Sequence, residues 1–361
     1  MSTLGHSGLR SRPTISRRGF TGLLGAAALA GHAAPAHAAG APAVDKTVKV
    51  ATGLYELVVS TTTNLLHVAS TGERGQNNAR IVGLDLQTLE VRSTVELGAD
   101  AVFGLGVNDR TGTLYGTDTR GGKLVAVDLR SGTVKARIGE GEAHLREVVV
   151  DPANNRAFVS VFGARDKPSA IWVVDTAANT LAGVISEGLE GGVAGLAYDP
   201  RNDRLFAAAL QSNEVVEVSP ARKAGVRRFA SGGEGPINLA YDPGSDRLFC
   251  TDQKSGQLAV LNAGSGQPVK VLDTGAGALG LALSADGALA FVANRNAGTV
   301  SVVDTRALTV LGSVPTGTHP NSVAVDGRSG LAYVTNKAAM APRGQPPADD
   351  PKGDTVSLIR V

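Results

Sequence analysis

Val300-Ser301-Val302-Val303-Asp304 is one copy of a short strand-like segment that recurs along the chain. Leu124-Val125-Ala126-Val127-Asp128 and Ile171-Trp172-Val173-Val174-Asp175 are two clear variants of it. Seven copies end at residues 85, 128, 175, 219, 262, 304 and 360. All but the last interval lie between 42 and 47 residues. A repeat of that length, made of short apolar segments, is typical of one blade of a β-propeller.

A second recurring segment carries an aromatic residue or a histidine at one fixed position. These positions are His67, Tyr115, Phe158, Phe206, Phe249, Phe291 and Tyr333. Turn sequences such as Asp242-Pro243-Gly244-Ser245-Asp246 precede it, since Pro presets φ and Asp bonds to the local backbone. The apolar segments are continuous rather than alternating, which indicates strands covered on both faces. The sequence therefore predicts an all-β protein, a seven-bladed β-propeller with four antiparallel strands in each blade.

The two ends of the repeat region complete each other. The last repeat supplies only three strands, at 322–325, 331–335 and 356–361. The segment from Thr47 to Gly53 supplies a spare strand near the N-terminus. We expect this strand to pair with the last one and close the ring, because closure removes exposed sheet edges. The propeller is predicted to span 44–361, after a short linker at 39–43.

The N-terminal segment has the features of an export signal. Ser16-Arg17-Arg18-Gly19-Phe20 is followed by an apolar stretch from Thr21 to Gly31 and by Ala36-His37-Ala38. This order of basic, apolar and small residues predicts a signal peptide over 1–38, too short for a membrane anchor. The paired arginines favour the twin-arginine type, and an ordinary secretory signal with two chance arginines is the alternative. We expect a periplasmic or secreted protein with no membrane insertion.

The charge balance excludes a generally basic protein. The whole chain has a formal net charge of +2, but the first 38 residues hold four arginines and no acid. Without them 31 basic and 33 acidic residues remain, a net charge of −2. A general nucleic-acid or membrane-surface binder would be clearly basic. Cys250 is the only cysteine, which excludes intrachain disulfides and multi-cysteine metal motifs.

The segment Tyr333-Val334-Thr335-Asn336, with its variant Phe291-Val292-Ala293-Asn294, carries a family resemblance. The repeat region resembles the YVTN β-propeller repeat family, a WD40-like group. Ile171-Trp172-Val173-Val174-Asp175 and Thr318-His319-Pro320-Asn321-Ser322 are similar to the periplasmic YncE-type propellers of that family. The resemblance implies a rigid ring with a ligand-binding face and a link of some members to nucleic acid. It implies no catalytic residues.

One face of such a ring gathers the starts of the first strands and the loops between second and third strands. The candidate ligand-binding residues at the strand starts are Tyr55, His144, Arg146, Asn238, His319 and Asn321. Those in the loops are Arg120, Lys254, Arg295 and Lys337. Basic residues occur in this loop in six of the seven blades, so we expect them around one mouth. The alternative is scattered surface charge. The long loop from Lys337 to Asp354 is expected to cover that face in part or to move.

These residues favour a monomeric, non-enzymatic protein that binds an anionic small molecule, oligomer or protein partner, with no cofactor and no metal. A metal-dependent, lactonase-like hydrolase is one alternative, for which Glu56, Glu147 and Asn238 are the only candidates. Weak binding of single-stranded nucleic acid is another. Base stacking needs exposed aromatic side chains, and only Tyr55, Phe103 and Phe162 are placed to supply them, so the binding is expected to be weak and salt-sensitive.

The segment Gly275-Ala276-Gly277-Ala278-Leu279-Gly280 matches a dinucleotide-binding motif. That motif requires a following helix whose N-terminus faces the phosphates. Here it joins two predicted strands of consecutive blades, so no nucleotide site is expected.

Overall fold

The computed structural model describes residues 40–361, except for 140, 142, 164–166 and 340–348. The predicted signal peptide at 1–38 therefore lies outside the described residues, as does much of the loop between Lys337 and Asp354. The described segments form strands and turns. None of them is a helix long and apolar enough to span a bilayer.

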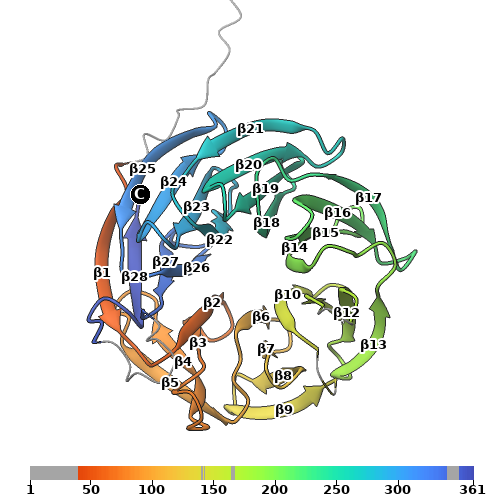
Figure 1. Ribbon diagram of the computed structural model, residues 1–361. Helices are drawn as coiled ribbons and strands as arrows, with labels where there is room; N and C mark the ends of the chain where they lie inside the picture. The colour runs from red at the N-terminus through yellow and green to blue at the C-terminus, as the bar shows by residue number, and fades with distance from the viewer. Residues whose placement is uncertain (1–39, 140, 142, 164–166, 340–348) are drawn as a thin grey trace, which may run out of the picture. The chain divides into compact units, whose positions relative to one another are not determined.

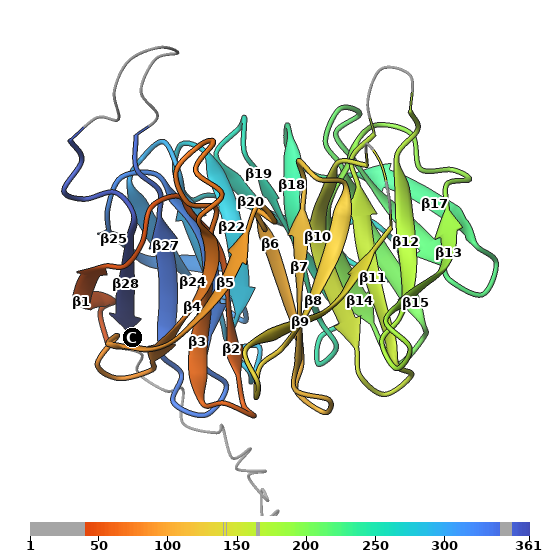
Figure 2. The ribbon, with the colours of Figure 1, turned by 90° about the horizontal axis from the view of Figure 1, so that it is seen from below.

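The described residues form seven four-stranded antiparallel sheets arranged radially about a central axis (Figures 1 and 2). Blade 1 contains β2 (Leu54–Ser60), β3 (Leu65–Ser70), β4 (Ala79–Asp85) and β5 (Val91–Gly98). Blade 2 contains β6 (Gly104–Asn108), β7 (Thr113–Asp118), β8 (Lys123–Asp128) and β9 (Thr133–Ile138). Blade 3 contains β10 (Leu145–Asp151), β11 (Arg156–Val161), β12 (Ala170–Asp175) and β13 (Thr180–Ile185).

Blade 4 contains β14 (Val193–Asp199), β15 (Arg204–Ala209), β16 (Glu214–Ser219) and β17 (Ala224–Ala230). Blade 5 contains β18 (Pro236–Asp242), β19 (Arg247–Asp252), β20 (Gln257–Asn262) and β21 (Pro268–Asp273). Blade 6 contains β22 (Ala278–Leu283), β23 (Leu289–Asn294), β24 (Thr299–Asp304) and β25 (Thr309–Pro315). Blade 7 contains β26 (Pro320–Val325), β27 (Ala332–Asn336), β28 (Thr355–Arg360) and β1 (Ala43–Lys49). The predicted fold is confirmed.

Blade 7 is completed by the N-terminal strand, as predicted. β1 pairs antiparallel with β28, and the Thr47 and Ser357 hydroxyls share a hydrogen bond of 2.8 Å. The strand begins at Ala43, four residues before the predicted range, because a bulge between Val44 and Lys46 lets the pairing continue. The bulged residue, Asp45, forms an ion pair with Arg360 at 2.9 Å.

The hydrophobic core lies between neighbouring blades. One cluster joins Phe291 and Val302 of blade 6 to Val334 and Ile359 of blade 7. All seven positions of the aromatic series are at most 2% exposed. The ring of His67 is packed in this way, and its burial lowers the pKa of its imidazole to about 4. The side chain is therefore neutral at physiological pH.

The acidic residue at the end of each third strand organises the turn that follows. The Asp175 carboxylate accepts hydrogen bonds from the backbone amides of Ala177 and Ala178, at 2.8 and 3.0 Å. Ser219 and Asn262 stand at the same position in blades 4 and 5. Their side-chain oxygens accept the equivalent amide hydrogen bonds, so the departure from Asp leaves the turn intact.

Candidate ligand site at the ring axis

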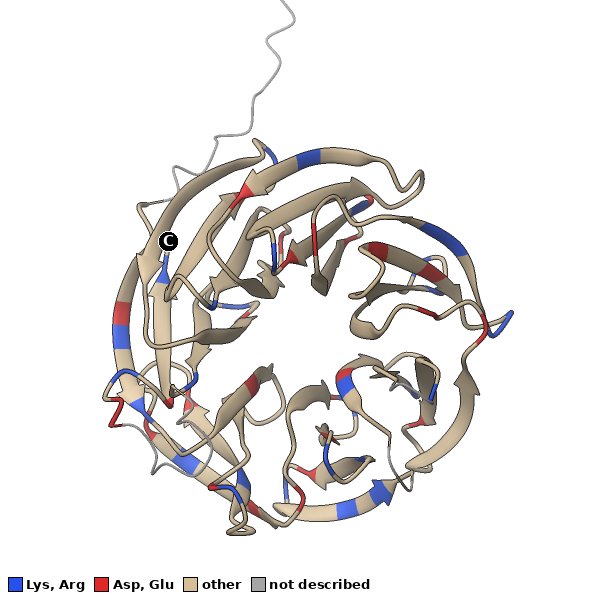
Figure 3. Cartoon of the chain, viewed as in Figure 1, with Lys and Arg blue, Asp and Glu red and all other residues tan. Residues whose placement is uncertain are grey.

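The innermost strands of the seven blades surround a cavity of about 340 Å³. Every blade contributes to its lining at one equivalent place, near the start of its first strand. Charged residues are concentrated on outer strands and loops, but β2 and β10 carry them beside the cavity (Figure 3). The cavity therefore lies where the sequence placed the candidate binding face.

A β-bulge marks this place in six of the seven blades. In β2 the pairing with β3 is interrupted between Leu54 and Leu57, and in β10 the interruption falls between Leu145 and Val148. The residues inside these bulges, Tyr55-Glu56 and Arg146-Glu147, line the cavity. A bulge redirects side chains that regular alternation would place elsewhere. The cavity residues are thus presented by local backbone irregularities.

The second residue of each cavity-lining pair alternates between a polar residue and glycine around most of the ring. The series, from blade 1 to blade 7, is Glu56, Gly104, Glu147, Gly195, Asn238, Gly280 and Ser322. A Cβ atom on Gly195 would lie 2.6 Å from the Ile237 carbonyl oxygen, and one on Gly280 would lie 2.5 Å from that of Asn321. These glycines are required because the next blade's innermost strand approaches closely.

Hydroxyl side chains on second strands hold the cavity residues in place. Thr335 Oγ1 donates a 2.6 Å hydrogen bond to the Tyr55 carbonyl oxygen, and Thr117 Oγ1 donates one of 2.7 Å to that of Arg146. Ser160 and Thr251 make the same bond to Ala194 and Leu279. Each bond links one blade to the next at the cavity, so the lining is rigidly positioned.

Four cationic side chains from four blades surround the ring of Tyr55. The Lys337 ammonium lies 3.3 Å from its centroid. Arg120, Arg146 and Arg295 all lower the pKa of the Tyr55 hydroxyl electrostatically, although its burial has the larger effect and raises that pKa. Tyr55 also packs edge-on against Phe103, with ring centroids 4.4 Å apart. The structure thus brings together four of the predicted basic residues.

These four cations interact with carboxylates only at longer range, Arg146 with Glu147 and Lys337 with Asp354. Within the part of the chain that the structure describes, none of them forms an ion pair. Arg120 and Arg146 lie instead over the rings of Phe103 and Phe162, at 5.3 and 5.0 Å. Arg295 donates a 2.6 Å hydrogen bond to the amide oxygen of Asn321. Such unpaired, closely spaced cations create a local positive potential.

Lys337 is the most buried of the four and is only 7% exposed. Its burial lowers the pKa of the ammonium to about 7, with further lowering by Arg295 and Arg120 and an opposing effect of Asp354. Bringing an anion next to it would restore the proton. Lys337 therefore titrates in the physiological range.

Two carboxyl groups line the same cavity, those of Glu56 and Glu147. Burial raises the pKa of Glu56 to about 7, although a hydrogen bond from the Ser322 hydroxyl lowers it in part. Burial and the nearby Glu56 raise the pKa of Glu147 further, against the effect of Arg146. The third residue of the predicted metal set, Asn238, also lines the cavity. No group of three or more His, Cys, Asp or Glu side chains suited to a metal occurs among the described residues.

Three predicted site residues lie outside this arrangement. His144 is exposed, and its carbonyl oxygen accepts a hydrogen bond from the Phe162 amide. His319 has a left-handed backbone, with φ of 44°, and its carbonyl oxygen accepts from the Lys337 amide. Lys254 lines a separate surface depression. His319 therefore positions Lys337 through its backbone, and the remaining two do not line the cavity.

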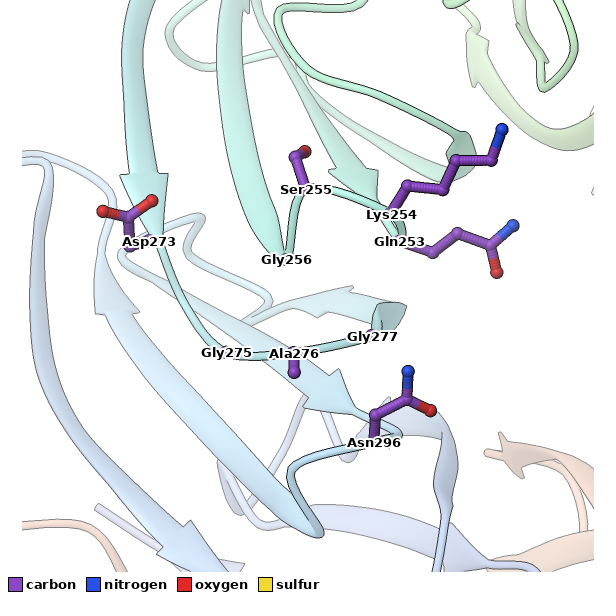
Figure 4. Close-up of a pocket in the computed structure, with 9 residues that line it drawn as sticks. All are labelled: Gln253, Lys254, Ser255, Gly256, Asp273, Gly275, Ala276, Gly277 and Asn296. Atoms are coloured by element: carbon purple, nitrogen blue, oxygen red, sulfur yellow. The ribbon is translucent and has the colours of Figure 1, made fainter.

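The depression beside Lys254, of about 640 Å³, is bordered by the glycine-rich segment Gly275–Gly277 (Figure 4). A Cβ atom on Gly277 would lie 2.8 Å from the Asn296 amide nitrogen. The glycines are thus explained by close packing of a turn between β21 and β22. No helix follows them, which agrees with the prediction that the motif is not a nucleotide site.

Several residues of the cavity were not predicted as ligand-binding. They include Thr119, Ile237 and the glycines Gly104 and Gly195. Aligning the repeats on their aromatic position would have identified Ile237 and the two glycines, since each stands at the same distance before its aromatic residue as Tyr55 or Glu56 does. Thr119 instead follows its aromatic residue, Tyr115, by four positions.

The fold and the cavity define this chain as a seven-bladed β-propeller with a charged axial cavity. Its sequence is 29% identical to the uncharacterized protein YncE of Salmonella typhimurium over 302 residues, covering 80% of this chain and 84% of that protein. YncE of Escherichia coli is likewise 29% identical, over 312 residues and the same shares. The predicted resemblance to YncE-type propellers is therefore confirmed. No protein-family model matches the sequence.

A solved structure of hydrazine synthase from Kuenenia stuttgartiensis has the same fold. It superposes with a TM-score of 0.67 and 17% sequence identity, covering 80% of this chain and 94% of that chain. At that identity the likeness shows the fold alone.

Proposed function

We propose that this chain is a non-enzymatic binding protein that holds an anionic ligand at the mouth of the axial cavity. The observation that carries the proposal is the set of four unpaired cations around Tyr55: Arg120, Arg146, Arg295 and Lys337. A fold that needed these charges only for stability would pair them with carboxylates. Leaving like charges together costs free energy unless an anion offsets the repulsion. An anionic ligand supplies that compensation.

The ligand is an anionic small molecule, or an anionic group on an oligomer or protein. Stacked nucleic-acid bases are a poorer match, because the faces of Tyr55, Phe103 and Phe162 already carry a cation each. A metal-dependent hydrolase would rest on Glu56, Glu147 and Asn238. Stoichiometric metal in the purified protein would favour it over the binding function.

The test is calorimetric titration with ethanesulfonate, whose charge does not change with pH. A triple variant, Arg120→Ala with Arg295→Ala and Lys337→Met, removes the cations and keeps an apolar side chain at the buried position. A charge-assisted hydrogen bond contributes about 1.5–3 kcal/mol, so the variant should lose at least about a hundredfold in affinity. The fold should persist, since none of the three forms an ion pair with a carboxylate in the described structure.

The matched control is Lys254→Ala, which removes a cation from the same face but from the separate depression. It should bind ethanesulfonate as the unchanged protein does. Equal losses in both variants would mean that general surface charge is responsible. Undiminished binding by the triple variant would contradict the proposal.

We also propose that the protein acts outside the cytoplasm, after twin-arginine export and removal of residues 1–38. The support is the Ser16–Phe20 segment and the Ala36-His37-Ala38 site. Replacing Arg17 and Arg18 with Lys should leave the precursor in the cytoplasm of the producing cell. Normal export of that variant would exclude the twin-arginine route.

A further inference from the structure

The axial cavity holds carboxyl groups as well as cations, and the two kinds are not paired with each other. Glu56 and Glu147 line it together with Arg146, yet no ion pair within 4.0 Å joins them in the described part of the chain. The Glu56 carboxylate accepts a hydrogen bond from Ser322. The Glu147 carboxyl has no hydrogen-bond partner among the described residues. Carboxyl groups and cations thus share one open cavity, where Glu147 and Arg146 act on each other electrostatically without forming an ion pair.

This separation is costly for the empty protein. Desolvation raises the pKa of the Glu147 carboxyl, which has no hydrogen-bond donor to offset it, and the buried Lys337 ammonium is desolvated too. Neutralising each other in direct ion pairs would reduce the cost. The bulges in β2 and β10 instead fix the carboxyl groups in the lining, while Tyr55 and Phe103 hold the cations at the mouth. Such an arrangement is complementary to a molecule that carries both charges.

Building on the proposed function, we propose that the ligand is amphoteric: its anionic group binds the four cations, and a protonated amine binds Glu56 and Glu147. The cavity volume of about 340 Å³ limits the part that enters to a small molecule or one terminal group. Glu147 is the principal amine partner, because its carboxyl group has no other donor. Asn238 lines the same space and can accept a further hydrogen bond through its amide oxygen.

Proton release is a second signature of this binding mode. Burial raises the pKa of both carboxyl groups, to about 7 for Glu56, so the Glu56 carboxyl is protonated in part near neutral pH. An ammonium group favours the ionised carboxylate, so the amine should expel a proton on binding. A ligand without the amine should not do so through these residues.

The experiment compares aminoethanesulfonate, hydroxyethanesulfonate and ethanesulfonate, together with their propane homologues, by calorimetry at neutral pH. These probes share one permanent anion and differ only in the far group. The amine should bind at least about tenfold more tightly than the alkyl probe of equal length. Titrations in two buffers of different ionisation enthalpy should detect proton uptake by Lys337 with every sulfonate, and less uptake or a net release with the amine.

The variant Glu147→Gln should remove the amine's advantage and most of the proton release. Its affinity for ethanesulfonate should rise, because a carboxyl group that repels the anion has gone. Gln has nearly the shape of Glu and no charge to bury, so an unchanged melting temperature serves as the folding check. Glu187→Gln, an exposed position on another surface, is the matched control and should change nothing.

The outcomes separate this inference from the proposed function. Equal affinities for the amine and alkyl probes would overturn the amphoteric ligand and leave the anion site standing. Equal affinities for the amine and hydroxyl probes would also overturn it, since the carboxyls would then serve a hydroxylated ligand. Failure of all sulfonates to bind would overturn both. Retention of the amine's advantage in Glu147→Gln would mean that other groups recognise it.

Discussion

The two ends of strand β10 carry arginines in opposite circumstances. At its end, Asp151 meets Arg156 of the next strand, which donates to Asp151 at 2.7 Å and to Asp203 of blade 4 at 2.6 Å. Arg156 also lies over the ring of Phe158, 5.1 Å from its centroid. At the start of the strand, Arg146 lies over a ring as well but pairs with no carboxylate in the described structure.

The arrangement at Arg156 recurs one blade further on. Arg204 donates to Asp199 and to Asp246 of blade 5, at 2.8 and 2.9 Å. Each of these arginines therefore bridges its own blade to the next through two carboxylates. The basic residues around Tyr55 also come from several blades but are bridged by nothing in the described chain. The comparison teaches that an arginine's role follows from its partners. On one face of the ring arginines link adjacent blades through ion pairs, and around Tyr55 on the other face they form no ion pair in the described structure.

Both faces of the ring, that of Arg156 and that of Arg146, are built on the same seven sheets and depend on the ring being closed. Deleting residues 44–53 removes most of β1 and exposes the edge of β28. We expect loss of cooperative unfolding and strong aggregation, which is the largest effect predicted here. Calorimetry and light scattering measure it. A melting temperature equal to that of the full chain would show that the ring closes without β1.

Within the closed ring, removing a paired arginine should cost far more stability than removing an unpaired one. Arg156→Met leaves Asp151, which is 2% exposed, as an uncompensated buried carboxylate. Breaking a buried pair in this way costs about 3–5 kcal/mol in the free energy of unfolding. Arg295→Met, the control on the cavity side, should cost less than about 1 kcal/mol. Urea denaturation measures the free energy of unfolding of both variants. Equal losses of stability in Arg156→Met and Arg295→Met would contradict the difference between paired and unpaired arginines.

The spacing of the innermost strands offers a smaller effect. Gly195→Ala would place a methyl group 2.6 Å from the Ile237 carbonyl oxygen and force blades 4 and 5 apart. Overpacking of this kind costs about 1–3 kcal/mol. Gly183→Ala is the control, because a Cβ atom there meets nothing within 4 Å. If the two variants unfold at the same urea concentration, the glycines around the axis are not required for packing.

The smallest predicted effect is the pH dependence of ethanesulfonate binding, which arises from Lys337 on the cavity side of the ring. Lys337, with a pKa of about 7, is protonated in about nine-tenths of molecules at pH 6 and one-tenth at pH 8. Because the anion binds the ammonium form, affinity for ethanesulfonate should fall about tenfold over that range. Ionisation of Glu56, also near pH 7, acts in the same direction. Lys337→Arg should flatten the profile, and an affinity that rises with pH would contradict it.

Through Lys337, the free energy of unfolding should depend on pH in the opposite direction to the affinity for the anion. The unfolded chain holds the Lys337 proton up to the ordinary pKa of 10.5, so above pH 7 the unfolded state binds more protons than the folded one. The contribution of Lys337 to the free energy of unfolding therefore rises with pH between these values. On the other face, the hydrogen bond from Arg156 lowers the pKa of Asp203, so its stabilisation is lost only in acid, as the carboxylate is protonated.

The ring was predictable because it repeats. Seven copies of an aromatic or histidine position and of the Val-rich strand that follows it specify blade number, strand order and closure, and the structure confirms all three. The presence of Tyr55, Arg120, Arg295 and Lys337 around one mouth followed from their matching places in the repeat. Their role as ligand contacts stays a prediction. Bulges could not be foreseen, because they depend on how the backbones of adjacent strands meet. Glu56, Glu147 and Asn238 were grouped from their repeat positions, but the cavity that they line was not predicted. The exclusion of Lys254 also escaped prediction, since side-chain direction in a short turn is not encoded by repeat position.

The ring has seven blades, and seven is an odd number. A strict alternation of glycine and larger residues at one repeat position therefore cannot continue around the whole ring. Side chain and glycine take turns from Glu56 through Gly280, so one pair of neighbouring blades must both present side chains. That pair is blade 7 and blade 1, where Ser322 meets Glu56 and donates a hydrogen bond to its carboxylate. The break in the alternation thus involves blade 7, the blade in which the N-terminal strand β1 pairs with the C-terminal strand β28. The two carboxyl groups of the cavity are therefore not equivalent: that of Glu56 accepts a hydrogen bond from Ser322, and that of Glu147 has no hydrogen-bond partner in the described structure.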